Sequence, residues 1–186
     1  MSAEGSDLVL EADPAQLAEV EKLLAEIPGA MTRATVRALN RVGRTMRTRV
    51  VRVLRKKLRM KSKTIRKRVW VDRANRKKQR VRVTSGYRGF PYADFSPVQT
   101  KKGVKVKLSR RQVLEHAFIA RMATGHVGVF RRKGTKRLPI QEQYTQSPAD
   151  ALREAAAAPE ILEEAGENLR KRLGVEAELI LEGKRK

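Results

Sequence analysis

The chain contains no cysteine and only two histidines, so the side chains that most often bind metals or act as nucleophiles are scarce. Without cysteine there can be no disulfide, thiolate nucleophile, iron–sulfur cluster or cysteine-rich zinc site. His116 and His126 lack an H-x-x-H spacing and paired carboxylates, and Gly125-His126-Val127-Gly128 lacks the lysine and hydroxyl residue of a P-loop. We therefore expect no enzymatic activity, no metal and no cofactor. Both histidines are predicted to serve in turns, packing or hydrogen bonds.

Long apolar runs are missing as well. No stretch approaches the roughly 20 apolar residues that a membrane-spanning helix needs. The acidic residues 1–13 do not follow the basic, apolar and small-residue order of a secretory signal. These features predict a soluble protein without a membrane partner that is first present in the cytoplasm. The length of 186 residues suits a single domain.

Acidic residues are nearly absent from the middle third of the chain. Residues 30–90 hold 23 lysines and arginines and one acid, Asp72, and so carry +22 of the formal net charge of +23. Residues 1–29 carry −6, and residues 91–186 carry +7. Basic side chains at this density repel one another unless a polyanion or an acidic partner compensates their charge. The composition therefore favours a binding partner over a merely solvated basic surface. A metal-dependent nuclease would need several carboxylates beside this basic region, which argues against that class of enzyme.

Helical periodicity, in contrast, is abundant. Asp13-Pro14 is an N-cap followed by proline at the first helical position, and apolar residues recur from there until Pro28-Gly29 breaks the pattern. A longer helix is predicted from Met31 to Leu58, where the apolar period is sustained for about seven turns of 3.6 residues. Within it, Gly43 costs roughly 1 kcal/mol relative to alanine unless it permits close packing of a neighbour.

Arginines at spacings of mostly three and four residues form a stripe along another face of this long helix. Their planar guanidinium groups suit bidentate contacts with phosphate or carboxylate oxygens. A nucleic-acid backbone and the glutamates of a partner helix would satisfy the stripe equally well, and both interpretations stay open. The predicted contact residues are Arg33, Arg37, Arg41, Arg44, Arg52, Arg55, Lys56 and Arg59.

A change to two-residue periodicity predicts strands after a short basic helix within 61–68, which we expect Ser62 to cap. Residues 69–71 begin this change, and valines alternate with basic residues in 80–83 and 104–108. The apolar segments 118–122, 127–130 and 138–140 predict consecutive hairpins. Four of the eight aromatic residues lie in the loop 86–95. We expect them to pack in a small core or interface rather than to stack on bases.

The last third of the chain again predicts helices. Ser147 is an N-cap with Pro148 at the first helical position and Asp150 at the capping-box position. A second helix begins at Pro159, with an apolar side from Ile161 to Leu173. Its early glutamates, Glu160, Glu163, Glu164 and Glu167, could complement the arginine stripe within or between subunits. The pattern leaves residues 175–181 open between helix and strand.

These elements together predict an α+β fold. It comprises N-terminal helices including one long basic amphipathic helix, a small antiparallel sheet of hairpins, and C-terminal helices. We expect one domain over 1–186, with a helical part at 1–60, a mainly β part at 61–146 and a second helical part at 147–186.

A block near the middle of the chain resembles a known family. The segment AFIARMATGHVGVFRRKG at 117–134, followed by RLPIQEQY at 137–144 and Ser147-Pro148, resembles the signature region of phage minor tail protein Z. These are tail-completion proteins of tailed bacteriophages and prophages. The acidic helix and the following basic helix resemble that family's N-terminal half, so the resemblance covers most of the chain. Tyr144-Thr145-Gln146-Ser147-Pro148 departs from the Tyr-Gly-Pro-Ser that members often carry. The residues that carry the signature are Phe118, Gly125, His126, Gly128, Phe130, Leu138, Pro139 and Ile140.

The resemblance implies a non-catalytic structural protein of the virion, added at the head-proximal end of the tail and present in the host cytoplasm before assembly. It implies roles in tail completion and head–tail joining, other tail and neck proteins as partners, a homo-oligomer in the form of a hexameric ring, and contact with the DNA end. An alternative from another class is a cellular DNA- or RNA-binding protein without sequence preference. That alternative explains the charge but leaves the glycine, histidine and phenylalanine block unexplained.

Overall fold

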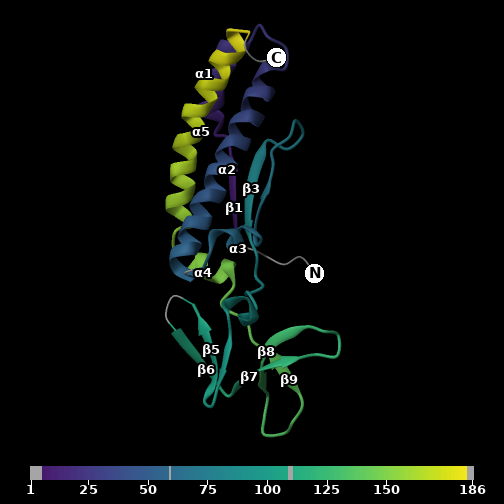
Figure 1. Cartoon of the computed structure of the whole chain (residues 1–186). Helices are drawn as coiled ribbons and strands as arrows, with labels where there is room; N and C mark the ends of the chain where they lie inside the picture. The colour runs from purple at the N-terminus through teal and green to yellow at the C-terminus, as the bar shows by residue number, and fades with distance from the viewer. Residues whose placement is uncertain (1–5, 59, 109–110, 184–186) are drawn as a thin grey trace.

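The computed structural model describes residues 6–58, 60–108 and 111–183, and it has the expected α+β architecture. A helical layer covers one face of a three-stranded sheet, and a smaller β part lies beyond one end of this body (Figure 1). The helices are α1 (Pro14–Leu24), α2 (Ala30–Leu58), α3 (Ser62–Arg66), α4 (Pro148–Glu154) and α5 (Ala158–Leu181). The expected helix starts at Pro14 and near Met31 are confirmed.

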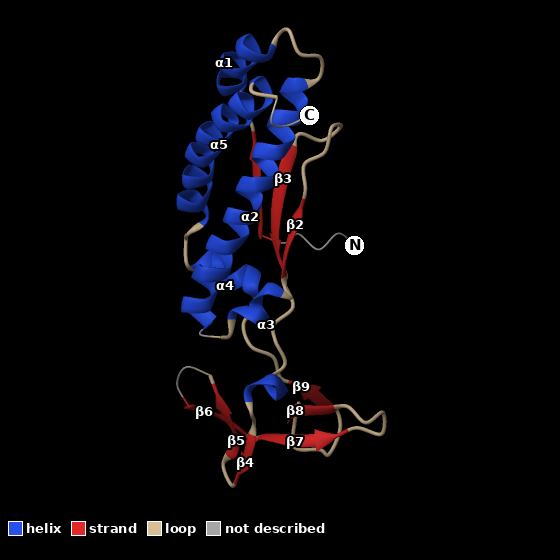
Figure 2. Cartoon of the chain, turned by 45° about the horizontal axis from the view of Figure 1, so that its top comes forward, coloured by secondary structure: helices blue, strands red, loops and turns tan. Residues whose placement is uncertain are grey.

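Helix α2 is central to the main body, because it packs against α5 on one side and against the sheet on the other (Figure 2). The residues that the periodicity predicted to be apolar supply these contacts. Leu39, Met46 and Leu54 of α2 are fully buried, together with Leu169 and Leu173 of α5. Since the core takes these faces, most charged residues of both helices are left at the surface, whereas Glu176 of α5 is buried. Helix α5 continues to Leu181, so residues 175–181, which the sequence pattern left open between helix and strand, are helical.

The sheet of the main body is antiparallel and has the order β1-β3-β2. Its strands are β1 (Ser6–Glu11), β2 (Val69–Asp72) and β3 (Arg80–Ser85). It therefore takes strands from both sides of residue 60, the boundary expected between a helical and a mainly β part. Gly43 of α2 is buried where the helix meets this sheet, and a Cβ there would overlap the side chain of Val81. Close packing at Gly43 is thus confirmed.

The smaller β part contains two three-stranded antiparallel sheets, with orders β4-β5-β6 and β7-β8-β9. Their strands are β4 (Val98–Thr100), β5 (Gly103–Lys107), β6 (Arg111–Glu115), β7 (Ala117–Arg121), β8 (Val127–Arg132) and β9 (Ile140–Glu142). A small core of Val104, Val106, Ala117 and Val129 joins them. The expected hairpins are confirmed.

The loop of 86–95 is used mainly for packing. Phe90 is buried in the main core, and Tyr92 and Phe95, in the short 3-10 helix η1 (Tyr92–Phe95), make an edge-to-face contact with ring centroids 6.3 Å apart. Both rings also pack against the small core of the β part. These contacts support the packing role over base stacking, with Tyr87 remaining exposed.

The two predicted caps have different outcomes. Ser147 caps α4 as expected, because its Oγ accepts a hydrogen bond from the Asp150 backbone N–H at 3.1 Å. The expectation that Ser62 caps α3 was wrong. Ser62 is the first helical residue, and the N-cap position is held by Lys61, which makes no capping hydrogen bond through its side chain. Among the described helices, none combines the length and the apolar character that crossing a membrane requires.

Candidate functional site

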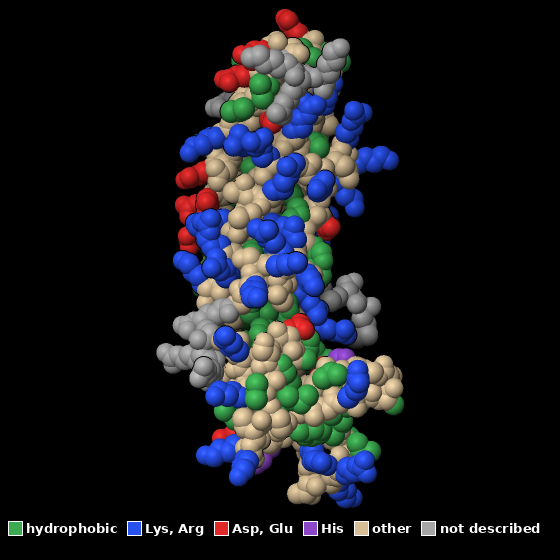
Figure 3. All heavy atoms as spheres, viewed as in Figure 1, with side chains coloured by type: hydrophobic (Ala, Val, Ile, Leu, Met, Phe, Trp, Pro, Cys, Tyr) green, Lys and Arg blue, Asp and Glu red, His purple; other side chains and the backbone are tan. Residues whose placement is uncertain are grey.

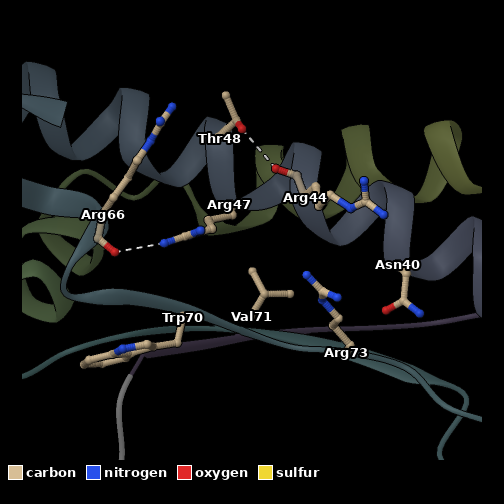
Figure 4. Close-up of a pocket in the computed structure, with 8 residues that line it drawn as sticks. All are labelled: Asn40, Arg44, Arg47, Thr48, Arg66, Trp70, Val71 and Arg73. Atoms are coloured by element: carbon tan, nitrogen blue, oxygen red, sulfur yellow. Dashed lines mark hydrogen bonds between the residues drawn. The ribbon is translucent and has the colours of Figure 1, made fainter. Parts of the chain in front are cut away.

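A hollow of about 450 Å³ lies between helix α2 and strand β2, and we call it the α2–β2 pocket (Figure 4). In Figure 4, Arg73 from just beyond β2 points into the space between helix and strand, while Arg44 extends along α2. Trp70 lies at the other end, with its ring on the side of the strand away from α2. The lining residues are Asn40, Arg44, Arg47, Thr48, Arg66, Trp70, Val71 and Arg73.

Hydrogen bonds to the backbone hold two walls of this pocket in place. Arg47 donates from Nε to the Val69 carbonyl at 3.0 Å and from Nη2 to the Arg66 carbonyl at 2.9 Å. The amide of Asn40 donates to the Ala74 carbonyl and accepts from the Ala74 N–H, both at 2.9 Å. These side chains of α2 thereby occupy the outer edge of β2, which would otherwise expose unpaired backbone groups. Because carbonyls accept its bonds, Arg47 is oriented, and no carboxylate of the described residues forms an ion pair with it.

The pocket carries four positive charges and no acidic side chain among its lining residues. Arg44, Arg66 and Arg73 are exposed, and within residues 6–58, 60–108 and 111–183 no carboxylate forms an ion pair with any of them. Guanidinium groups gathered without a counter-charge favour an anion that can accept several hydrogen bonds at once. The geometry therefore suits phosphate or carboxylate groups of a partner.

Two further hollows share lining residues with the pocket. One of about 510 Å³ shares Asn40 and Arg44 with it and is otherwise lined by Arg37, Arg41 and Glu176. Another of about 380 Å³ shares Arg73 and is otherwise lined by Asp72, Asn75, Lys78, Arg80 and Arg82. We call these three hollows, which share lining residues, the basic track. Its far end is partly neutralised, because Arg82 pairs with Asp7 at 3.3 Å and Arg80 with Glu11 at 3.9 Å.

The three hollows include only part of the predicted arginine stripe. Arg37, Arg41 and Arg44 line the basic track together. Arg33 is half-buried, and its Nη1 donates to the Pro28 carbonyl at 3.2 Å, which ties the start of α2 to the preceding turn. Farther along α2, three exposed residues lie outside the three hollows: Arg52, Arg55 and Lys56. The predicted contact residue Arg59 lies outside the described residues.

Of the eight lining residues, the sequence predicted only Arg44 as a contact residue; the residues that it missed include Arg47, Arg66, Trp70 and Arg73. Arg47 follows Arg44 by three residues, so the helical spacing could have included it. Trp70 stands between Val69 and Val71 in a strand whose valines face the core, and alternation could have placed it outward. Arg66 and Arg73 lie on other elements, and only the packing of these elements against α2 brings them to the pocket.

The glutamates of α5 partly complement the basic helix within the same chain. Arg49 of α2 donates from Nε to Glu164 Oε2 at 2.6 Å and pairs with Glu160 at 3.4 Å. Arg49 was not among the predicted contact residues. Glu163 and Glu167 are exposed instead. Figure 3 shows acidic side chains along the edge where α5 lies, and basic side chains over the neighbouring face. The molecule thus presents surfaces of opposite charge.

The signature residues gather in the sheet β7-β8-β9. Phe118 of β7 faces Phe130 of β8, with ring centroids 6.3 Å apart, and His126 meets the edge of Phe130 at 6.4 Å. A Cβ at Gly128 would lie 2.8 Å from the Phe130 ring, so this position requires glycine. Gly125 adopts a φ of +83° in the turn between the strands. Ile140 begins β9 opposite Arg132, whereas Leu138 is exposed, and the Leu138–Pro139 bond is cis.

A hydrogen-bonded trio lies on this sheet. His126 Nε2 lies 2.9 Å from Glu142 Oε1, and the Tyr144 hydroxyl donates to Glu142 Oε2 at 2.6 Å. Burial by itself raises the pKa of Glu142, but the hydrogen bonds from Tyr144 and His126 and the charge of His126 outweigh it, so the pKa lies below its usual value. The hydrogen bond to Glu142 raises the pKa of Tyr144. His126 therefore has a hydrogen-bonding role. In the described parts of the chain, no cluster of three or more histidine and carboxylate side chains could hold a metal ion.

Comparison with known proteins identifies the family. Neither the curated proteins nor the solved structures include a significant match. A family model described as prophage minor tail protein Z (GPZ) matches residues 17–181. This range includes α2, the basic track, the signature sheet and α5. The chain therefore belongs to the prophage minor tail protein Z family and has a structural role in a phage tail.

Proposed function

We propose that this protein completes the phage tail at its head-proximal end and takes part there in head–tail joining. In this proposal it is a subunit of a hexameric ring, with other tail and neck proteins as its partners. Family membership supports the tail role. The separation of an acidic edge along α5 from a basic face on α2 also supports a ring, because each copy could offer opposite charges to its two neighbours (Figure 3).

The basic track is proposed to contact DNA in this position. The observation that carries this proposal is the α2–β2 pocket, where arginines from α2, α3 and the end of β2 converge without a carboxylate among the lining residues. Phosphate neutralisation by such groups is insensitive to sequence and releases counterions, so affinity falls steeply with salt. A protein at the end of a tail would need contact of this kind, since the DNA sequence that passes it is not selected.

The cellular nucleic-acid-binding alternative would use the same track. Family membership supports the tail role over it, because the matched residues include the block 125–140 that the alternative leaves unexplained. A cellular role would further predict full function without other tail proteins. Complementation of a phage that lacks this gene, scored by the formation of infectious particles, would separate the two.

Charge reversal within α2 tests the DNA contact. Arg41→Glu with Arg44→Glu alters the basic track, whereas Arg52→Glu with Arg55→Glu alters an equally exposed part of the same helix and is the matched control. On duplex DNA, the log–log dependence of affinity on salt should have a slope of about −0.9 per phosphate contact. The slopes are compared on dilute, unassembled protein, so that an effect of the control on assembly does not enter. We expect the first pair to flatten the slope by about two contacts and the control to change it less. Equal slopes for the two pairs would place the DNA elsewhere.

A further inference from the structure

The only tryptophan of the chain lies at the α2–β2 pocket with 49% of its surface exposed. Its neighbours in β2 face the core, so strand alternation directs Trp70 away from it. One edge of the ring lies against Gly86, because a Cβ built there would lie 3.1 and 3.2 Å from two of its carbon atoms. Trp70 also stands opposite Thr84 in the ladder between β2 and β3. The structure thus holds a large exposed aromatic ring among the lining residues of a pocket that also contains four arginines.

We propose that the α2–β2 pocket binds an unpaired segment of nucleic acid, with a base stacked on Trp70 and the adjacent phosphates held by Arg44, Arg47 and Arg73. This inference rests on the proposed DNA contact and specifies which form of DNA the site takes. Aromatic rings beside a basic groove are the combination by which proteins bind single strands without sequence preference. The two kinds of side chain would bind different parts of a nucleotide, since the arginines neutralise the phosphate and the indole covers the base.

The dimensions of the site favour a single strand over a duplex. A hollow of about 450 Å³ has the size of a site for a small ligand and can hold about one nucleotide. In a duplex the bases are paired and stacked, so none of them presents a free face to Trp70. The two adjoining hollows share Asn40, Arg44 and Arg73 with the pocket and would take flanking phosphates. The exposed residues Arg52, Arg55 and Lys56 lie outside these hollows and stay available to other anionic surfaces.

An acidic peptide is the competing occupant. The carboxylates of an acidic peptide could pair with the four arginines, but they would not account for the exposed indole of Trp70 in the same pocket. A nucleotide accounts for both features, because its base can stack on Trp70 and its phosphate can pair with the arginines. The observations therefore favour nucleic acid, and the peptide becomes an outcome of the test.

Intrinsic fluorescence provides a direct test, because the full chain contains no other tryptophan. The protein would be titrated with single-stranded oligodeoxythymidylate, with a duplex of the same number of phosphates, and with polyglutamate. We expect the single strand to quench Trp70 and the other two to leave its emission nearly unchanged at saturation. Equal quenching by duplex would overturn the preference for an unpaired strand. Quenching by polyglutamate alone would assign the pocket to an acidic protein.

Substitution of Trp70 separates stacking from charge. Trp70→Ala should weaken binding of a labelled single strand by about 5- to 100-fold, as expected for one lost base stack, whereas Trp70→Phe should retain most of the affinity. Neither change should alter the salt slope or duplex binding, because no charge is removed. Arg44→Gln should flatten the salt slope for both forms of DNA. Far-ultraviolet circular dichroism would confirm that each variant is folded.

The two proposals fail in different ways. If Trp70→Ala leaves single-strand affinity unchanged while Arg44→Gln still flattens the slope, stacking is refuted and the proposed DNA contact stands. If Arg44→Gln changes neither the salt slope nor the affinity for any form of DNA, the stacking proposal and the proposed DNA contact are both refuted.

Discussion

Gly43 lowers the helical propensity of α2 but allows the sheet to approach its backbone. Gly43→Ala would add a Cβ against Val81, which is fully buried in the central strand of its sheet and has little room to move. We expect a loss of about 1 to 3 kcal/mol in the free energy of unfolding, because overpacking outweighs the gain in helix propensity. Urea denaturation of the wild type and of Gly43→Ala would measure this loss in the free energy of unfolding.

Gly166 in α5 is the matched control. A Cβ there meets no atom of the described residues within 4 Å, so Gly166→Ala should instead raise stability by up to about 1 kcal/mol. If both substitutions stabilise the protein, the contact between Gly43 and the sheet is looser than described.

Glu142 should make the signature sheet sensitive to acid. Its pKa is lowered below the ordinary value of 4.5, because the hydrogen bonds from Tyr144 and His126 outweigh its burial. A lowered pKa contributes stability that is present above the unfolded value and is lost as the pH falls through the folded value. The difference in melting temperature between wild type and Glu142→Gln should therefore be largest near neutral pH and shrink below about 4.5. A difference that is constant from pH 3 to 7 would contradict this.

Single residues differ in how far the sequence could predict them. The turn at Gly125 and the cap at Ser147 depend on local backbone geometry, and their residue types indicate it directly. The sequence alone could not distinguish Arg33 from the other arginines of the stripe. Its bond to the Pro28 carbonyl depends on how the chain turns before α2, whereas spacing places it in line with Arg37.

At the scale of elements, periodicity was the strongest predictor. The apolar period of α2 depends only on its own residues, and so its bounds could be predicted closely. The α2–β2 pocket could not be predicted in this way, since Arg66 and Arg73 reach it from different elements. Nothing local to either residue indicates that α2 will lie beside it. The pairing of β1 with β3 could not be predicted locally either, because partners such as Leu8 and Val83 are 75 positions apart in the sequence.

The contact between α2 and α5 should carry much of the stability of the main body. Leu169 is buried against α2, and Leu169→Ala would leave a cavity, so we expect a loss of about 2 to 5 kcal/mol in the free energy of unfolding. Leu181 ends the same helix with half of its surface exposed, and Leu181→Ala should change stability by about 0.5 kcal/mol or less. Chemical denaturation of both variants compares a buried and an exposed leucine of one helix. Similar losses would mean that α5 is not docked as described.

At the scale of the whole molecule, the charges limit how copies can assemble. Arg49 already pairs with Glu160 and Glu164 inside the chain, which leaves Glu163 and Glu167 as exposed acids of α5. Arg52 and Arg55 are exposed on α2 and form no ion pair within the described residues. In a head-to-tail ring, the acidic edge of one copy can meet the basic face of the next. The proposed ring would then depend on attraction between these two pairs of residues.

Reversing either pair alone should therefore prevent assembly. Glu163→Lys with Glu167→Lys puts like charges at every contact, and so does Arg52→Glu with Arg55→Glu. Mixed in equal amounts, the two variants can alternate around a ring with an even number of subunits. Each contact then joins either the two altered surfaces or the two unaltered ones, and both combinations are attractive. Sedimentation velocity at moderate salt should show small species for each variant and restored rings for the mixture. If the mixture stays as small as its components, these surfaces do not face each other in the assembly.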